Sequence, residues 1–442
     1  PLWRDRRGPC LPAGREGHNI NNITFPGSPV LCLAAAGRDG ELHKKGGKKM
    51  KRGLIFVLMV SLILLPVFVF GQGVTDKEVV IGLTTPLSGP AALWGVTGMG
   101  AKAWADYINE QGGVHGRKIK VILKDDGYNP ARALANLQEM KGQVFAVTAL
   151  LGTAVVSACR DFFHENKIPL ILPYGNIRMF ADYPKDKLRY IFVAYPDYED
   201  EAGFFTNFAL KSLATKKMAV FYQNDDYGKM GLEGVKKTLG ENPGKADLVA
   251  TVPYEVTERA LGTHALKLKE SGAGTVILYP TMSHGALILK EMAKVGYQPK
   301  AICSFPLGDP IMYKIAGDVW EGVYVAGPAN SGVPGADREA DKVAEILKKY
   351  DSNIAGKEYL GVFGAVSMMY AVEGLKKAGR NPTPEKMIEG LEKIKNWKPE
   401  GLGAPVTFDR NRHSGVNGVR MMQARKGVHV PITDFVIFKP RF

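Results

Sequence analysis

The stretch that decides the fold reads VVIGLT at 79–84, TPLSGPAALWG at 85–95, GMGAKAWADYINEQGG at 98–113 and KIKVILKDDGYNP at 118–130. The first run is short and apolar, as in a parallel strand covered on both faces. The third run repeats apolar residues at i, i+3, i+4 and i+7, which predicts one apolar stripe on a helix that its two final glycines end. The fourth run begins the next strand. The stretch is therefore a βαβ unit.

The loop at 84–95 follows the carboxyl end of the first strand and carries Ser88 and Trp94. In open α/β sheets, ligands bind in the crevice beyond the carboxyl ends of the strands. We therefore interpret this loop as a candidate ligand-binding segment.

Apolar runs alternate with helical periods in two consecutive series along the rest of the chain. The first series predicts strands at 144–151, 169–172 and 190–193, and the second at 218–222, 248–254, 275–279, 301–304 and 323–326. Two such series predict an α/β fold with two doubly wound lobes. We expect lobe 1 at 74–193 plus 328–405 and lobe 2 at 194–327 plus 406–442, with crossing segments near 194–201 and 323–335. Thr383 is the expected N-cap of the last helix, ahead of Pro384.

The N-terminal region has the three parts of a secretory signal peptide at 50–73. A short basic start precedes an apolar run at 54–70, and Gly71-Gln72-Gly73 supplies small residues for cleavage. We expect a secreted, periplasmic protein; the alternative is an uncleaved signal that anchors it to the membrane. Residues 1–49 show no helical or strand period, so we interpret them as a disordered leader or translated upstream sequence.

Charge and cysteine content exclude two classes of protein. Residues 1–73 contain 11 Lys or Arg against four Asp or Glu, so half of the net charge of +14 lies there, and the other basic residues are dispersed. Without a basic stripe interleaved with aromatic residues we expect no nucleic-acid partner. Cys159 and Cys303 lie in apolar, element-forming sequence and are interpreted as buried free thiols, not a disulfide framework.

No catalytic, nucleotide-binding or metal-binding motif is present in the sequence. Gly228, Gly231 and Gly234 lack the dinucleotide-binding spacing and are interpreted as turn and packing glycines. Asp125 and Asp126 follow a strand and precede a glycine, which favours a loop or hinge role over acid–base catalysis. We expect no catalytic residue, no metal and no cofactor.

The positive signals are those of a ligand binder. Gly152-Thr153-Ala154 opens a helix directly after a strand, so its backbone N–H groups and the Thr153 hydroxyl are candidates to hold a ligand carboxylate. The alternative is that Thr153 only caps the helix. Candidate aromatic walls follow strands at Trp94, Tyr174, Tyr195 and Tyr227, where core packing explains an aromatic poorly. Glu258, in a loop between a strand and a helix, is a candidate partner for a ligand ammonium group.

Four segments together resemble the periplasmic binding proteins of ABC transporters for branched-chain amino acids and related ligands. They are IGLTTPLSGPAALWG at 81–95, AWADYINEQGGVHGRKIKVILKDD at 103–126, NDDYG at 224–228 and LKLKESGAGTVIL at 266–278. The resemblance runs from residue 78 to the end of the chain. It implies a type I periplasmic-binding-protein fold, with two Rossmann-like lobes, three crossing segments and hinge closure on a ligand.

By position, the resemblance implies that Trp94 covers the ligand side chain, Gly152 and Thr153 hold its carboxylate, Tyr227 contacts it from the second lobe and Glu258 binds its ammonium. This chain departs from the family pattern in two places. At Tyr174 and Gly175 it has a bulky phenol where the family commonly has small residues, and in the turn expected to hold the carboxylate only Thr153 bears a hydroxyl.

Two functions follow as hypotheses. In the first, a monomeric receptor captures a branched-chain amino acid, another amino acid or an aromatic acid and delivers it to an ABC permease. In the second, a regulatory protein of the same fold senses an amide or urea-like ligand. An enzyme ranks last, because the sequence shows no nucleophile and base set.

Overall fold

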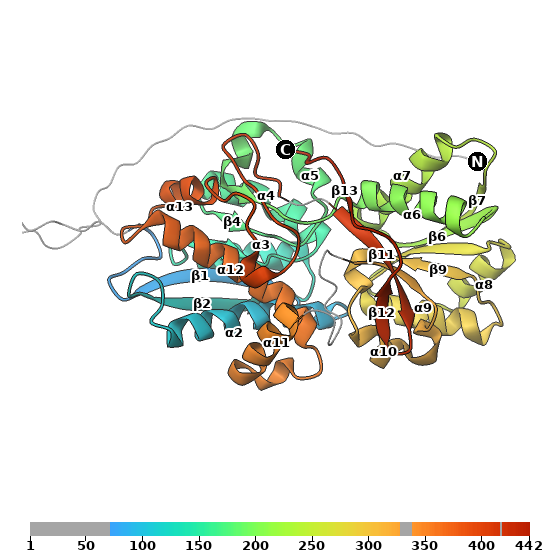
Figure 1. Ribbon diagram of the computed structural model, residues 1–442, viewed down its shortest axis with the longest axis horizontal. Helices are drawn as coiled ribbons and strands as arrows, with labels where there is room; N and C mark the ends of the chain where they lie inside the picture. The colour runs from blue at the N-terminus through green and yellow to red at the C-terminus, as the bar shows by residue number, and fades with distance from the viewer. Residues whose placement is uncertain (1–70, 328–337, 416–417) are drawn as a thin grey trace, which may run out of the picture. The chain divides into compact units, whose positions relative to one another are not determined.

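The computed structural model describes residues 71–327, 338–415 and 418–442. The predicted leader, nearly all of the predicted signal peptide and the predicted crossing loop at 328–335 lie outside them. Within them are two α/β lobes, coloured blue to light green and green to yellow in Figure 1, to which C-terminal elements return.

The first lobe is built on a five-stranded sheet in the order β2-β1-β3-β4-β5, and every pair in it is parallel. Its strands are β1 (Glu78–Thr85), β2 (Lys118–Asp125), β3 (Ala146–Thr148), β4 (Leu170–Ile171) and β5 (Ile191–Phe192). Its helices are α2 (Val96–Glu110), α3 (Pro130–Met140), α4 (Thr153–Asn166), α5 (Arg178–Ala181), α11 (Arg338–Tyr350), α12 (Glu358–Ala378) and α13 (Pro384–Leu391).

The second lobe repeats that topology. Its parallel strands run β7-β6-β8-β9-β10, the same order as in the first sheet, and β11 and β12 add antiparallel strands beyond β10, with β13 paired to β11. The strands are β6 (Lys217–Gln223), β7 (Asp247–Tyr254), β8 (Thr275–Tyr279), β9 (Lys300–Cys303), β10 (Tyr324–Gly327), β11 (Gly418–Arg425), β12 (Val428–Pro431) and β13 (Val436–Ile437). The helices are α6 (Tyr198–Ser212), α7 (Asp226–Gly240), α8 (Gly262–Glu270), α9 (Met282–Lys294) and α10 (Ile311–Ala316).

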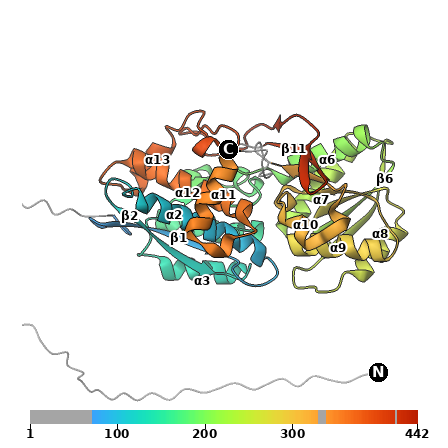
Figure 2. The same cartoon turned by 60° about the horizontal axis from the view of Figure 1, so that its bottom comes forward.

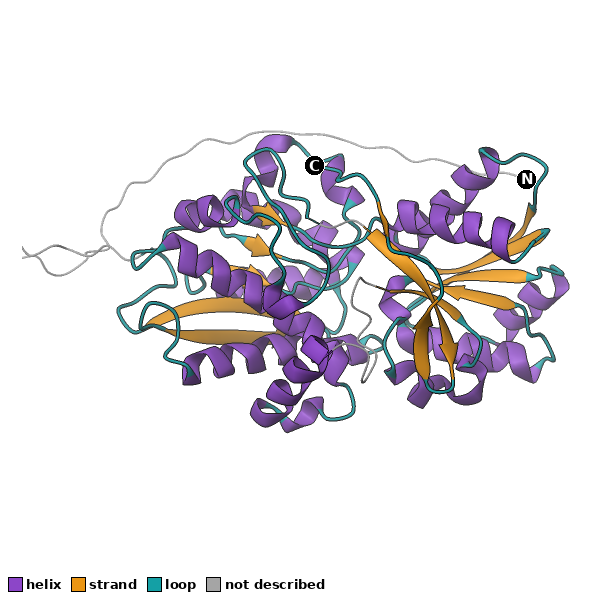
Figure 3. Cartoon of the chain, viewed as in Figure 1, coloured by secondary structure: helices purple, strands orange, loops and turns teal. Residues whose placement is uncertain are grey.

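Helices cover both faces of each sheet. In Figure 1, α6 and α7 lie above the second sheet and α9 and α10 below it, and Figure 2 shows α2 and α12 on the opposite side of β1 from α3. Figure 3 shows the strands enclosed between these helical layers. Neighbouring residues of one strand therefore belong to different hydrophobic cores. Ala146 is buried in the core that contains side chains of α2 and α12, and Val147 is buried in the core that contains side chains of α3 and α4. The predicted α/β doubly wound fold is confirmed.

Short 3₁₀ turns and bridges shape the connections. The turns are η1 (Ala92–Gly95), η2 (Lys185–Tyr190), η3 (Phe305–Leu307), η4 (Gly317–Trp320), η5 (Ser352–Ile354) and η6 (Pro399–Gly401). Val193 donates to the His413 carbonyl at 3.0 Å and accepts from the Gly415 N–H at 2.7 Å, so two chain segments between the lobes lie side by side. The predicted lobe boundaries stay a prediction.

Several local predictions are confirmed and others need correction. Thr383 caps α13 by accepting from the Lys386 N–H. The strand predicted at 144–151 is too long, because β3 ends at Thr148 and Ala149 adopts a φ of 54° that breaks the extended run. The loop predicted at 84–95 ends in η1, which continues directly into α2.

Candidate functional site

A cavity lies between the two lobes. The first lobe contributes Trp94, Thr97, Tyr128, Leu151, Gly152, Thr153, Tyr174, Leu360 and Phe363, and the second contributes Tyr195, Tyr198, Tyr227, Met282, Phe305, Pro306, Gly308 and Asp309. Six of the nine predicted site residues line the cavity: Trp94, Gly152, Thr153, Tyr174, Tyr195 and Tyr227.

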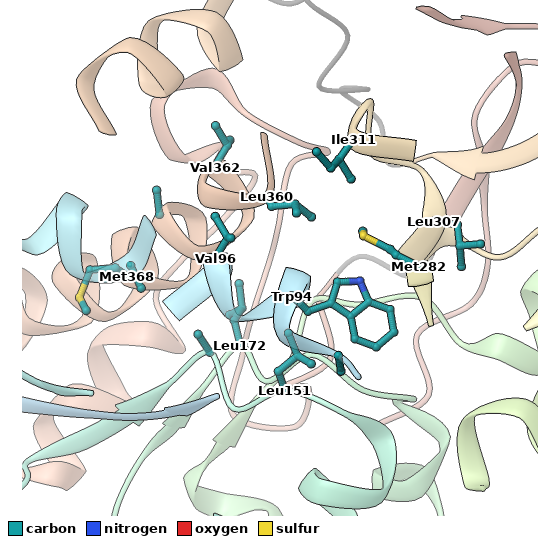
Figure 4. Close-up of a cluster of buried hydrophobic side chains, with 14 of the residues drawn as sticks. Trp94, Val96, Leu151, Leu172, Met282, Leu307, Ile311, Leu360, Val362 and Met368 are labelled. Carbon is teal, nitrogen blue, oxygen red and sulfur yellow. The ribbon is translucent and has the colours of Figure 1, made fainter. Parts of the chain in front are cut away.

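Topology explains why these residues meet. In both lobes the strand order reverses beside the first strand, between β1 and β3 and between β6 and β8, and such switch points open a crevice at the carboxyl ends of the strands. Trp94 follows β1 and Tyr227 follows β6, while Thr153 follows β3 and Met282 follows β8. The side chains of Trp94 and Met282, drawn in Figure 4, come from different lobes and line the same cavity.

The turn before α4 presents the first backbone N–H groups of the helix, from Thr153 onward, whereas the Gly152 N–H predicted to join them donates to the Tyr174 carbonyl at 2.8 Å. Gly152 has a φ of 106°, and a Cβ there would lie 2.6 Å from Cε2 of Tyr128, so only glycine fits. The first N–H groups of a helix have no intrahelical partner and attract anions. The Thr153 hydroxyl accepts from the Asn176 N–H at 3.2 Å, which holds its side chain beside these groups.

Aromatic side chains form most of the remaining wall, and several of the tyrosine hydroxyls are held by hydrogen bonds. Tyr174 donates to the Phe363 carbonyl, Tyr198 donates to the Tyr195 hydroxyl at 3.0 Å, and Tyr227 contacts the Ser304 hydroxyl. Burial raises the pKa of Tyr227 well above its usual value, so the phenol stays neutral. The wall is thus a set of fixed, uncharged rings.

Asp309 is the one charged side chain among the described residues that line the cavity. It is 4% exposed, its Oδ1 accepts from the Ile311 N–H at 2.8 Å, and its Oδ2 has no hydrogen-bond partner within the described part of the chain. Burial raises its pKa to about 7, while the Ile311 bond opposes that shift and the Glu358 carboxylate adds to it.

Sequence reasoning missed Asp309, although a signal was present. It follows β9, the fourth strand of its sheet, as Tyr174 follows β4 in the other sheet. Matching the loops of the two lobes strand by strand would have selected it. The other missed lining residues include Tyr128, Phe305 and Phe363.

Three of the predicted site residues do not line the cavity. Ser88 is exposed, and its hydroxyl donates to Oδ2 of Asp125 at 2.6 Å. Gly175 lies behind the cavity wall, where a Cβ would meet the Thr153 backbone at 3.2 Å. Glu258 follows β7, an edge strand on the far side of the switch point.

The Glu258 carboxylate is engaged locally. Its Oε1 accepts from the Glu255 N–H at 2.7 Å, and its Oε2 lies 3.4 Å from Nε2 of His264. The ammonium-binding role predicted for it therefore has no support from its position.

The predicted packing glycines are confirmed, because a Cβ at Gly231 would lie 2.5 Å from the Tyr279 ring and one at Gly234 would lie 2.5 Å from the Glu199 carbonyl oxygen. Cys159 and Cys303 are buried and free, as predicted.

In the described ranges, no cluster of three His, Cys, Asp or Glu side chains is placed to hold a metal ion. No helix there is both long and apolar enough to cross a bilayer.

A second cavity adjoins the first. Four aromatic residues line both cavities and separate them: Tyr174, Tyr195, Phe305 and Phe363. The Phe305 and Phe363 rings, which come from different lobes, pack edge to face at 5.7 Å. The second cavity is otherwise largely apolar.

Comparison with known proteins places the chain in a family. Residues 78–428 match the family model described as periplasmic binding protein. The chain is 25% identical over 374 residues to Leu/Ile/Val-binding protein homolog 1 of Brucella abortus (strain 2308), covering 84% of this chain and 96% of that protein.

Solved structures share the fold. A branched-chain amino acid ABC transporter protein from Thermus thermophilus with bound valine superposes with a TM-score of 0.72 at 20% identity, covering 83% of this chain and 97% of the other. A fatty acid ABC transporter substrate-binding protein from Thermomonospora curvata gives a TM-score of 0.71 at 21% identity, covering 84% and 95%. With its two repeated lobes and its match over residues 78–428, this chain belongs to the periplasmic binding protein family.

Proposed function

We propose that the protein is an extracytoplasmic receptor that captures a small carboxylate-bearing solute between its lobes and delivers it to an ABC permease. The observation that carries this proposal is the cavity between the two sheets, which faces the N-terminus of α4 at Gly152 and Thr153. A helix of 14 residues offers its unpaired N–H groups and dipole to an anion there.

The relatives support an amino acid as the solute, since curated members are described as Leu/Ile/Val-binding proteins and one solved structure holds valine. The described cavity wall is aromatic and apolar apart from Thr97, Thr153, Asp309 and the phenols, which suits a solute with an apolar side chain. We infer binding without chemistry, because this wall holds no nucleophile paired with a base. A cleaved signal at 50–73, a periplasmic location and a monomeric state complete the proposal.

One observation favours a second class of solute. The adjoining, largely apolar cavity offers a place for an extended tail if the aromatic partition opens, and one structural neighbour is described as a fatty acid ABC transporter substrate-binding protein. A carboxylic acid with an extended apolar chain is therefore the second candidate.

Thermal unfolding against a solute panel tests the proposal. The panel contains leucine, isoleucine, valine, phenylalanine, aromatic acids, medium-chain fatty acids and short amides. A solute present at 1,000 times its Kd stabilises the folded state by about 4 kcal/mol, which a melting curve resolves. A clear shift with at least one carboxylate is the expected result, and no shift with any member would contradict the receptor proposal.

A further inference from the structure

The aromatic partition between the two cavities consists of Tyr174, Tyr195, Phe305 and Phe363, which line both. The Tyr195 ring lies 6.0 Å from the Tyr174 ring and 5.3 Å from the Phe305 ring, measured between centroids. The Phe305 ring in turn lies 5.7 Å from the Phe363 ring. The Tyr174 hydroxyl completes the circuit by donating to the Phe363 carbonyl. The partition is therefore continuous from one lobe to the other.

Hydrogen bonds hold the partition in place. The Phe305 N–H donates to Oε1 of Glu201 at 2.8 Å, and this carboxylate is buried on α6. The Tyr195 hydroxyl accepts from the Tyr198 hydroxyl at 3.0 Å. Moving either aromatic residue bodily aside would break such a bond within the protein interior, where an unsatisfied polar group is costly.

The lining differs in chemistry on the two sides of the partition. The first cavity contains the Thr153 end of α4 and the Asp309 carboxylate. No charged side chain stands among the described residues that line the second cavity, and its aliphatic members are Leu172, Val362, Val366, Leu402 and Val406 together with three alanines. A carboxylate held at α4 would keep its polar end in the first cavity, so the part of a solute that suits the second cavity is an apolar tail.

We propose that Phe305 and Phe363 set the length of the solute. With their rings in contact, the site takes a carboxylate whose apolar part ends in the first cavity and rejects one whose tail has to enter the second. This inference rests on the proposed receptor function and decides between its two candidate classes of solute. Because the two rings come from different lobes, a tail threaded between them would also separate a contact that joins the lobes.

Two homologous series of solutes measure the length that the site accepts. One series is butanoate, hexanoate, octanoate and decanoate, and the other is L-norvaline, L-norleucine, L-2-aminooctanoate and L-2-aminodecanoate, so that the result does not depend on an amine. Each solute is titrated calorimetrically into the wild-type protein and its variants, below the concentration at which it forms micelles.

The variants remove one ring at a time. Phe305→Ala and Phe363→Ala open the partition from either lobe, and Phe363→Leu removes the ring but keeps an apolar side chain. Phe208→Ala is the matched control, because Phe208 is half-buried like Phe363 but packs against Tyr324 outside both cavities.

In the wild type we expect affinity to pass through a maximum within a series and to fall roughly 10-fold or more from there to its longest member. In Phe305→Ala and Phe363→Ala the longest member should bind roughly 10-fold or more tightly than in the wild type, because each methylene that reaches an apolar lining is worth roughly 4-fold in affinity. Phe208→Ala should keep the wild-type order. Retained binding of the shortest solute that the wild type binds shows that a variant is folded.

Wild-type affinity that rises through the longest member would show that the partition is no barrier. The same maximum in the wild type and in both alanine variants would refute Phe305 and Phe363 as the limit, and so would an equal shift in Phe208→Ala. If the alanine variants bound nothing, Phe363→Leu would decide, and an unchanged maximum there would overturn the inference. If no solute of either series or of the wider panel bound the wild type, the receptor function itself would fail.

Discussion

Replacing Asp309 by asparagine should stabilise the solute-free protein increasingly as the pH rises. The pKa of the Asp309 carboxyl is raised from 3.8 to about 7 by burial. The folded state therefore binds this proton more tightly than the unfolded chain does. The carboxyl costs no stability below pH 3.8, costs more with each pH unit up to 7 and reaches a plateau above that pH.

The magnitude follows from the size of the shift. One pKa unit corresponds to about 1.4 kcal/mol, so the full penalty is about 4 kcal/mol, and more than half of it develops between pH 5 and pH 8. Asparagine carries no charge and keeps the bond to the Ile311 N–H. Burying its amide adds a cost that does not change with pH, so the pH dependence of the difference isolates the carboxyl.

Urea unfolding of the wild type and Asp309→Asn at pH 5, 6, 7 and 8 measures this difference. We expect the variant to gain about 2–3 kcal/mol relative to the wild type over that range, while Asp318→Asn, at an exposed aspartate outside the cavity, shows a flat difference. Glu358 also raises the pKa of Asp309, so Glu358→Gln should reduce the effect without abolishing it. A difference that stays constant within about 0.5 kcal/mol from pH 5 to pH 8 would refute the buried, unpartnered carboxylate.

Three further substitutions test the geometry of the site and its support. Gly152→Ala should cost about 1–3 kcal/mol of stability in urea unfolding and weaken solute binding, because the added Cβ meets the Tyr128 ring. Gly112 is the control: it has a comparable positive φ but open space around it, so Gly112→Ala should cost only the backbone strain. Gly364→Ala should cost about 3 kcal/mol by forcing α12 away from α2, because its Cβ would lie 1.6 Å from the Thr97 carbonyl oxygen; a normal urea midpoint would contradict that packing. Trp94→Ala should weaken solute binding roughly 10-fold or more in calorimetry by removing one aromatic wall, and unchanged affinity would place the solute elsewhere.

The sequence predicted those parts of the site that follow directly from strands. Trp94, Thr153 and Tyr227 come after the first or third strand of a lobe, so the rule for parallel sheets places them at the crevice without knowledge of tertiary contacts. The same reasoning placed Glu258 there, but β7 is an edge strand away from the reversal in strand order. Strand order is a tertiary property that no local pattern reveals.

Other parts of the site depend on contacts distant in sequence. Phe363 lies on α12, which returns to the first lobe after the whole second lobe has formed, so its place beside Phe305 has no local signal. Asp309 follows the short turn η3, which is too brief to show a period. Its burial comes from packing, and an isolated aspartate in a Gly-Asp-Pro sequence is typical of an exposed turn.

The central claim, that one small solute is held between the lobes, is tested most directly by a crystal structure with the tightest solute from the panel bound. We predict that the solute lies in the cavity between Trp94 and Met282, with its carboxylate at the Thr153 N–H. A solute bound elsewhere on the protein, or a cavity closed by the protein's own side chains in the complex, would contradict the account.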